Sequence, residues 1–209
     1  MKLTLLIILT VQIQFMSFAQ DSTIFEYKSI DEALLNPEKV VRLNLSDQQL
    51  IFSPNIWKQF VNLQYLSLKN EHLSEVPEGL VELKSLKVLD LSGNDFINLP
   101  YNFFELRSLE ELYLNDEKQL DLDSALQILV KLPKLKSLHL ENDGLKIIPA
   151  EFSNFSQLEY LYLNGNKLKE VPINILQLKN LKYIDVNQNQ IDPKNWNSKN
   201  PYSNITIKF

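Results

Sequence analysis

Apolar residues recur along the chain in a fixed frame that the residues between them do not share. In "LEYLYLNGNKLKEVP" (158–172), apolar side chains stand at the first, fourth, sixth, eleventh and fourteenth positions. The segment "LKVLDLSGNDFINLP" (86–100) has the same frame, although most of the residues between differ. Side chains alternate along a strand, so the fourth and sixth positions predict a short strand with two inward-facing side chains.

The frame repeats along most of the chain with a nearly constant period. Successive repeats start about 23 residues apart, and only the step between the fourth and the fifth is longer. They begin at Val40, Leu63, Leu86, Leu109, Leu135, Leu158 and Leu181. One such unit cannot bury its apolar face alone, so each strand is expected to pair in parallel with the next. The period therefore predicts a solenoid of about seven stacked repeats.

Residues 40–191 resemble the leucine-rich repeat family, specifically its 23-residue class with the pattern L-x-x-L-x-L-x-x-N-x-L-x-x-L-P. The resemblance implies an α/β repeat solenoid: a right-handed horseshoe with a parallel sheet on the concave face and irregular, 3-10 or short helical segments on the convex face. We expect a secreted, bacterial member of the family.

One position of the pattern departs from the family in four repeats. Family members bond an asparagine side chain to the backbone across repeats at this position. Here Asn94, Asn166 and Asn189 hold it in three repeats. The other four repeats carry Gln48, Glu71, Glu117 and Asp143. This argues against a continuous asparagine ladder.

The repeats have expected caps at both ends and one insertion. Before them, in the cap at 20–39, Ser29 and Glu32 form a capping-box pattern ahead of a short helix that Pro37 ends. After them, the cap at 192–209 ends in the alternating "NITIKF", a possible last strand. In the lengthened fourth repeat, helical spacing of Leu122, Ala125, Leu126 and Leu129 predicts an α-helix. We interpret the insertion as a longer convex segment; a partner-specific bulge is the alternative.

The N-terminal segment, residues 1–19, has the order of a secretory signal. Lys2 precedes an apolar run, and the small residues Ser17 and Ala19 mark a cleavage site that leaves Gln20 first. Export to the periplasm, cell surface or medium is the prediction, and an uncleaved anchor is the alternative. No later stretch is long and apolar enough to span a bilayer.

Composition narrows the partner classes. The chain is 44% apolar and 22% charged, which is ordinary for a folded soluble protein. A net charge of -5 argues against a nucleic-acid partner. The chain has no cysteine, which excludes disulfides, thiolate catalysis and cysteine-based metal sites.

Outward-facing strand positions gather rings in the later repeats. The predicted patch contains Tyr113, His139, Tyr160, Tyr162 and Tyr183, flanked by Asp90, Glu111, Asp185 and Asn187. Tyrosine is enriched at recognition surfaces, although it also suits exposed strands in general. We predict a surface that binds a protein or peptide through the concave sheet. A glycan-binding surface and a structural, self-assembling adhesion module are the alternatives.

Catalysis has little support in the sequence. His139 facing Asp90 or Glu111 could in principle hold a metal or relay protons, but nothing supplies a nucleophile or an oxyanion site. His72 falls in a turn, where a solvated side chain is expected. We therefore expect that the protein is not an enzyme and that it binds no cofactor and no metal.

Overall fold

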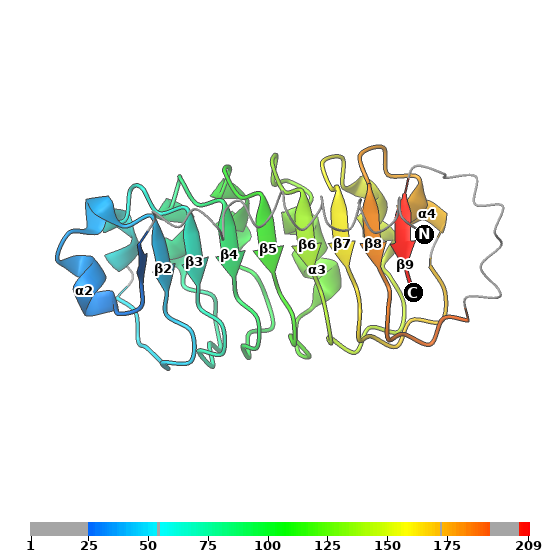
Figure 1. Cartoon of the computed structure of the whole chain (residues 1–209), viewed down its shortest axis with the longest axis horizontal. Helices are drawn as coiled ribbons and strands as arrows, with labels where there is room; N and C mark the ends of the chain where they lie inside the picture. Colours follow the sequence, from blue (N-terminus) through cyan, green and yellow to red (C-terminus); the bar gives the residue numbers. More distant parts are fainter. Residues whose placement is uncertain (1–24, 54, 172, 193–204) are drawn as a thin grey trace.

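In the part of the chain that the structure describes, nine strands form one parallel sheet, and their order in the sheet is their order in the chain (Figure 1). The structure is a computed structural model, and it describes residues 25–53, 55–171, 173–192 and 205–209. The strands are β1 Glu26–Tyr27, β2 Arg42–Asn44, β3 Tyr65–Ser67, β4 Val88–Asp90, β5 Glu111–Tyr113, β6 Ser137–His139, β7 Tyr160–Tyr162, β8 Tyr183–Asp185 and β9 Thr206–Lys208. The predicted repeat solenoid is confirmed.

Strands β2 to β8 each begin two residues after the start of a repeat, and equivalent positions pair across the sheet. Leu66 pairs with Leu89, and Leu112 pairs with Leu138. These leucines are fully buried, as is Leu114 in the sixth position of its repeat. The apolar frame therefore forms one continuous core along the inner side of the sheet.

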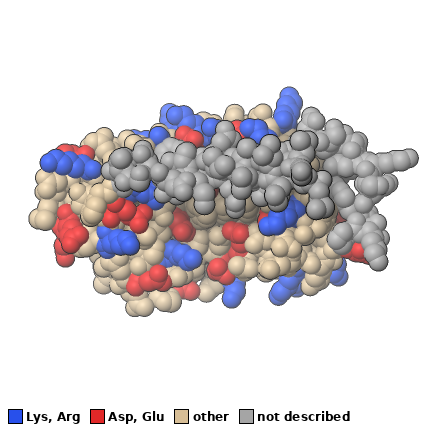
Figure 2. Space-filling view, viewed as in Figure 1, with Lys and Arg blue, Asp and Glu red and all other residues tan. Residues whose placement is uncertain are grey.

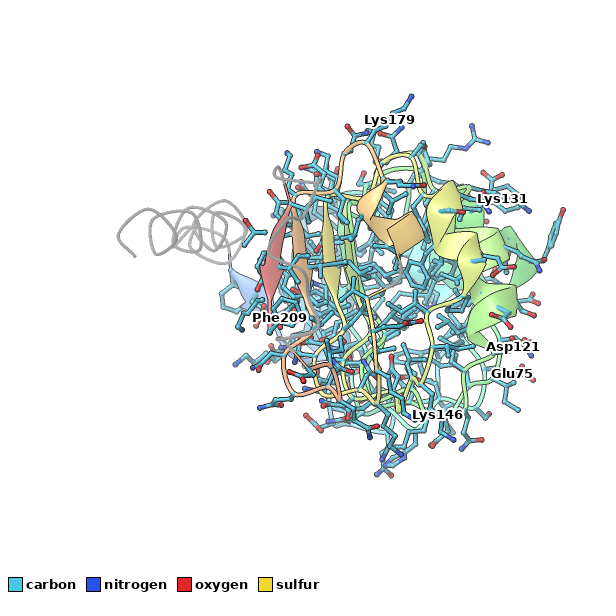
Figure 3. All side chains as sticks on the ribbon, turned by 90° about the vertical axis from the view of Figure 1, so that its right-hand side faces the viewer. Glu75, Asp121, Lys131, Lys146, Lys179 and Phe209 are labelled. Carbon is cyan, nitrogen blue, oxygen red and sulfur yellow. The ribbon has the colours of Figure 1, made fainter. Side chains whose placement is uncertain are left out.

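The side opposite the sheet consists of short helical segments (Figure 3). They are η2 Ile56–Gln59, η3 Glu78–Glu82, η4 Tyr101–Glu105, α3 Leu122–Leu129, η5 Ala150–Asn154 and α4 Ile173–Leu176. Prolines stand immediately before η3, η4 and η5, at Pro77, Pro100 and Pro149. Proline fixes φ and has no amide hydrogen, so it ends the extended segment that precedes each turn.

The insertion in the fourth repeat is accommodated in this convex layer. Helix α3 is the helix that the spacing predicted, and the Asp121 side chain caps it by accepting from the Ser124 amide. The helix packs against η4 and η5. Strands β5 and β6 stay in register, with Glu111 opposite Ser137. The extra residues therefore leave the concave sheet unchanged.

At the N-terminal end, helix α2 (Ile30–Leu34) follows Ser29, whose hydroxyl accepts from the Glu32 amide over 3.4 Å. The capping pattern predicted this helix. The segment η1 (Pro37–Lys39) follows it, and β1 adds a strand that the sequence did not predict. The predicted signal at 1–19 and most of the C-terminal cap lie outside the described residues. Within them, no helix has the length and apolar character needed to cross a bilayer.

Every repeat uses a left-handed residue at the same position, two residues after its second buried leucine or its equivalent. The φ angles there lie between 56° and 73°. The residues are Asp47, Asn70, Gly93, Asp116, Asn142, Gly165 and Gln188. Glycine, asparagine and aspartate tolerate this conformation best, so six of the seven residue types suit the turn.

The polar position that follows this turn forms a ladder of hydrogen bonds between repeats. Asn94 Oδ1 accepts from the amides of Glu71 and Leu73, at 3.1 and 3.0 Å. Glu71 does the same with its two carboxylate oxygens, which accept from the amides of Gln48 and Leu50. The asparagines are not continuous, as expected, but in three of the four repeats without asparagine an acidic side chain accepts a backbone hydrogen bond: Glu71, Glu117 and Asp143.

Candidate functional site on the concave face of β4 to β8

The predicted patch residues come from the two outward positions of successive strands. One row across the sheet reads Asp90, Tyr113, His139, Tyr162 and Asp185. The other row reads Glu111, Ser137, Tyr160 and Tyr183. Asn187 follows β8 in the turn. The sheet register thus brings eight of the nine predicted residues to one face, and Asn187 follows at its edge.

Four of the five rings form a continuous aromatic strip, defined here as Tyr113, His139, Tyr162 and Tyr183. The Tyr113 and His139 rings are stacked with centroids 3.9 Å apart, and the His139 and Tyr162 rings with centroids 4.1 Å apart. Tyr183 continues the strip, with its centroid 5.5 Å from that of Tyr162. Neighbouring strands are about 4.8 Å apart, so flat side chains in one row meet face to face.

Tyr160, the fifth predicted ring, lies in the row of Glu111 and Ser137. It lies opposite Tyr183 in the sheet, and the Lys182 ammonium is 5.9 Å from the centre of its ring. Lys182 in turn pairs with Glu159. Tyr160 therefore borders a charged pair at the margin of the aromatic strip.

His139 contacts two carboxylates. Its Nε2 atom lies 3.0 Å from Glu111 Oε1, which also accepts a 2.7 Å hydrogen bond from the Tyr113 hydroxyl. Its Nδ1 atom lies 3.5 Å from Glu141 Oε2, a distance suited to an ion pair but without hydrogen-bond geometry. Glu141 was not among the predicted site residues, although its position two residues after His139 places it on the same face.

Asp185 is held at the other end of the strip. The Tyr183 hydroxyl donates to Asp185 Oδ2 over 3.2 Å, and the Asn187 amide donates to Oδ1 over 3.0 Å. Lys208 of β9 lies 2.8 Å from Oδ2. The sequence did not predict Lys208 at this site, because the register of the last strand was unknown.

The rings on this face are half-buried or buried. Tyr113 and Tyr162 are half-buried, and Tyr160, Tyr183 and His139 are buried. Burial, together with the Glu111 carboxylate, raises the pKa of Tyr113, and burial with Asp185 raises the pKa of Tyr183. Both hydroxyls therefore stay protonated and act as donors at neutral pH.

The arrangement offers no metal centre within the part of the chain that the structure describes, where no suitable group of three or more His, Asp or Glu side chains occurs. Asp90 is separated from His139 by Tyr113 in its row, and its Oδ1 accepts from the Ser92 amide over 2.9 Å. His72 is exposed in its turn, as expected, with its Nδ1 3.2 Å from Asp95.

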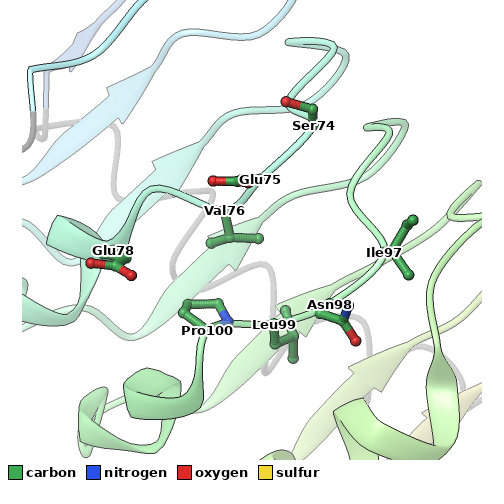
Figure 4. A pocket seen from close by; sticks show the side chains of 8 residues that line it. All are labelled: Ser74, Glu75, Val76, Glu78, Ile97, Asn98, Leu99 and Pro100. Atoms are coloured by element: carbon green, nitrogen blue, oxygen red, sulfur yellow. The ribbon is translucent and has the colours of Figure 1, made fainter.

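A separate hollow lies on the loops of the second and third repeats (Figure 4). Its volume is about 320 Å³, with Val76, Leu99 and Pro100 among the apolar residues of its wall and Glu75 and Glu78 among the polar ones. It shares no residue with the aromatic strip. The hollow is therefore separate from the concave cluster. On the surface visible in Figure 2, basic and acidic side chains are interspersed.

Comparison with protein families identifies the class. A family described as "Leucine-rich repeat region" matches residues 39–125, and one described as "Leucine Rich repeats (2 copies)" matches residues 156–198. Together the two matches cover more than half of the chain. The chain belongs to the leucine-rich repeat family.

Solved structures agree with this assignment. A leucine-rich repeat protein of Leptospira interrogans matches with 27% identity and a TM-score of 0.61, over 80% of this chain and 48% of that one. The Drosophila Toll–Spatzle complex matches with 22% identity and a TM-score of 0.63, over 82% of this chain and 23% of that one. A TLR13–ssRNA13 complex matches with 22% identity and a TM-score of 0.58, over 80% and 29%. The chain thus spans less than half the length of each of these three structures. Comparison with curated proteins finds no match.

Proposed function

We propose that the chain is an exported, non-catalytic leucine-rich repeat module that binds a protein or peptide through its concave face. The stacked strip of Tyr113, His139, Tyr162 and Tyr183 carries this proposal. Rings fixed by packing lose little conformational freedom when a partner binds, and tyrosine hydroxyls add hydrogen bonds. A preorganised aromatic surface of this kind suits the centre of a protein interface.

The fold alone does not choose the class of partner. One similar structure is a complex with the protein Spatzle, and another is a complex with ssRNA. The charge of this chain supports the protein partner. A net charge of -5 and the concave carboxylates Asp90, Glu111, Glu141 and Asp185 would repel a phosphate backbone.

Glycan binding has weaker support from the geometry of the strip. Sugar rings stack on the faces of aromatic side chains, but His139 is covered on both faces by Tyr113 and Tyr162. The strip therefore presents ring edges and hydroxyls. The edges of aromatic rings carry partial positive charge and suit peptide carbonyl groups better than the apolar face of a sugar.

Export is the second part of the proposal, and the order of residues 1–19 supports it. The test is intact-mass analysis of protein recovered from outside the cytoplasm. We expect a chain that begins at Gln20. A recovered chain that retains Met1 would contradict cleavage at this site.

The binding proposal is tested by substitution at the centre of the strip. A partner would first be captured with the purified chain, and its affinity for Tyr162→Ala would then be measured by titration. We expect a loss of about thirtyfold, because truncating a central aromatic anchor costs about 2 kcal/mol. Tyr183→Ala and His139→Ala should weaken the same partner less.

Lys146→Ala is the matched control. Lys146 is exposed on a turn away from the sheet (Figure 3), so its loss should leave the affinity unchanged. Circular dichroism would establish that each variant is folded. Equal affinity of Tyr162→Ala and the unmodified chain would place the binding site elsewhere, with the α3 side as the next candidate.

A further inference from the structure

The His139 imidazole is enclosed by groups from three strands. Glu111 and Tyr113 face it from β5, Tyr162 faces it from β7, and Glu141 faces it from the turn after β6. The Ser137 hydroxyl, on the same strand as His139, lies 3.3 Å from Nε2. Among the described residues, the charged groups in direct contact with the ring are therefore two carboxylates.

This environment distinguishes between the two protonation states of the ring. A neutral imidazole has one N–H donor and one acceptor nitrogen, whereas an imidazolium has two donors. Both ring nitrogens of His139 face carboxylate oxygens, at 3.0 Å for Glu111 and 3.5 Å for Glu141. In a neutral ring, one nitrogen lone pair would face a carboxylate, so the geometry favours the imidazolium.

The direction of the His139 pKa shift agrees with the geometry. Burial by itself lowers the pKa of His139, but its interactions with Glu111 and Glu141 outweigh burial and raise the pKa above the ordinary value. The same interaction with His139 lowers the pKa of Glu141.

The two flanking rings add to the preference. Tyr113 and Tyr162 lie parallel to the imidazole on opposite faces, at interplanar angles of 19° and 5°. The faces of aromatic rings are electron-rich and attract cations. A charged His139 is therefore attracted by both neighbours in its row, and it loses these attractions when it loses its proton.

We propose that His139 is a positioning residue that keeps the aromatic strip assembled only while the imidazole carries a proton. The idea rests on the proposed function, because it describes the regulation of that same binding surface. Loss of the proton leaves Glu111 and Glu141 facing an uncharged ring. The positive charge that offsets these two carboxylates is then gone. The parallel packing of Tyr113 and Tyr162 then loosens, so partner binding becomes dependent on pH.

The test uses nuclear magnetic resonance of the full chain without any partner. The chain has two histidines, so two imidazole Cε1–H signals are expected, and His72→Gln assigns them. The pH is varied from about 5 to about 9, where histidine titrates. We expect His139 to titrate with a midpoint above 6.5, its ordinary value, and the Tyr113 and Tyr162 ring signals to shift at the same pH.

Two carboxylate variants separate the specific effect from general charge. Glu111→Gln should lower the His139 midpoint by about one pH unit, because it removes an opposite charge in direct contact. Glu110→Gln is the matched control. Glu110 is the preceding residue and pairs with Lys136 at 3.6 Å instead of His139. This variant should leave the midpoint nearly unchanged.

Three results would overturn the inference: a His139 midpoint at or below 6.5, equal shifts in the two glutamate variants, or tyrosine signals that do not follow His139. His139→Gln gives an independent check, because its near-ultraviolet circular dichroism should lose the pH dependence seen in the unmodified chain. These measurements need no partner. A failure of the Tyr162→Ala binding test would therefore be distinguishable from a failure here.

Discussion

The backbone amide of Asn94 donates a 2.7 Å hydrogen bond to Glu117 Oε1, which lies one repeat further along the chain. Asn94 occupies the same repeat position as Glu117, one repeat earlier, and its side chain both accepts and donates hydrogen bonds. Its Nδ2 atom donates to the carbonyl oxygens of Leu68 and Leu91. Glu117 accepts at one oxygen, and its other oxygen, Oε2, is buried without a hydrogen-bond partner in the described structure. Burial raises the pKa of Glu117 to about 8 and that of Asp143, the next member of the ladder, to about 7.

Stability should therefore fall as the pH rises from about 4 to about 8. The ordinary pKa of glutamate is 4.5, so between 4.5 and about 8 folded Glu117 binds more protons than unfolded Glu117. The same holds for Asp143 between 3.8 and about 7. A carboxyl group with a raised folded pKa contributes fully below its unfolded pKa. It loses this contribution as the pH rises from the unfolded pKa to the folded pKa. Urea denaturation at a series of pH values measures the decrease.

Glu117→Gln isolates the contribution of one residue. Glutamine retains an acceptor, supplies the amide donor and does not titrate, so the variant should lose less stability between about pH 6 and about pH 9 than the unmodified chain. His139 has a raised pKa and contributes in the same direction in both proteins, so it cancels in the comparison. An identical pH dependence in the two proteins would show that Glu117 is ionised throughout.

Glycines in the left-handed turns offer a test of backbone conformation. Gly93 has φ of +71°, and a Cβ atom added there would lie 2.1 Å from Asn70 Oδ1. Gly93→Ala should cost about 1–2 kcal/mol for the left-handed backbone. It should cost about 1 kcal/mol more for displacing the Asn70 amide, whose Nδ2 donates to Asp47 over 2.9 Å. Equilibrium denaturation measures the sum.

Gly144→Ala is the control for the left-handed backbone, at a position two residues after the turn residue Asn142. Gly144 has φ of +76°, but an added Cβ would meet nothing within 4 Å. This variant should lose the backbone contribution alone, whereas Gly165→Ala should resemble Gly93→Ala because Asn142 Oδ1 would lie 2.0 Å from its Cβ. Equal losses in all three variants would mean that the asparagine side chains move away at no cost.

The buried leucines of the frame predict a larger effect. Leu163 is fully buried beside β7, so Leu163→Ala should lower the free energy of unfolding by about 2–5 kcal/mol through the cavity it leaves. Ile147 lies on a turn with 77% of its surface exposed, and Ile147→Ala should change stability by less than about 0.5 kcal/mol. If thermal unfolding of the two variants were the same, the assignment of the inward positions would be wrong.

The sequence predicts the sheet well because its signal is local and repeated. The positions of Leu161 and Leu163 predict a strand, and repetition of the frame at a fixed period predicts its neighbours and their register. Helix α3 follows from the spacing of Leu122, Ala125 and Leu126 in the same way. The left-handed turn was missed, although Asp47, Asn70 and Gly93 at one repeat position are the residue types that indicate it.

The concave cluster was predicted in its membership but not in its chemistry. The register places Tyr113, His139 and Tyr162 in one row, but the parallel orientation of their rings depends on side-chain rotamers. The contact between His139 and Glu141 depends in the same way on the path of the turn after β6. The asparagines of the polar ladder are interrupted, as predicted, but the sequence did not predict that Glu71 accepts the same backbone hydrogen bonds as Asn94 does.

The insertion that forms α3 lengthens one side of the coil while Glu111 remains opposite Ser137 on the other. The two sides of a repeat are therefore free to diverge separately. Additions to the convex loops can change the bulk and curvature of the molecule, while backbone pairing keeps the spacing of the concave rows fixed. Outer segments can therefore be exchanged between repeats of such a chain, while the row from Tyr113 to Asp185 keeps its order.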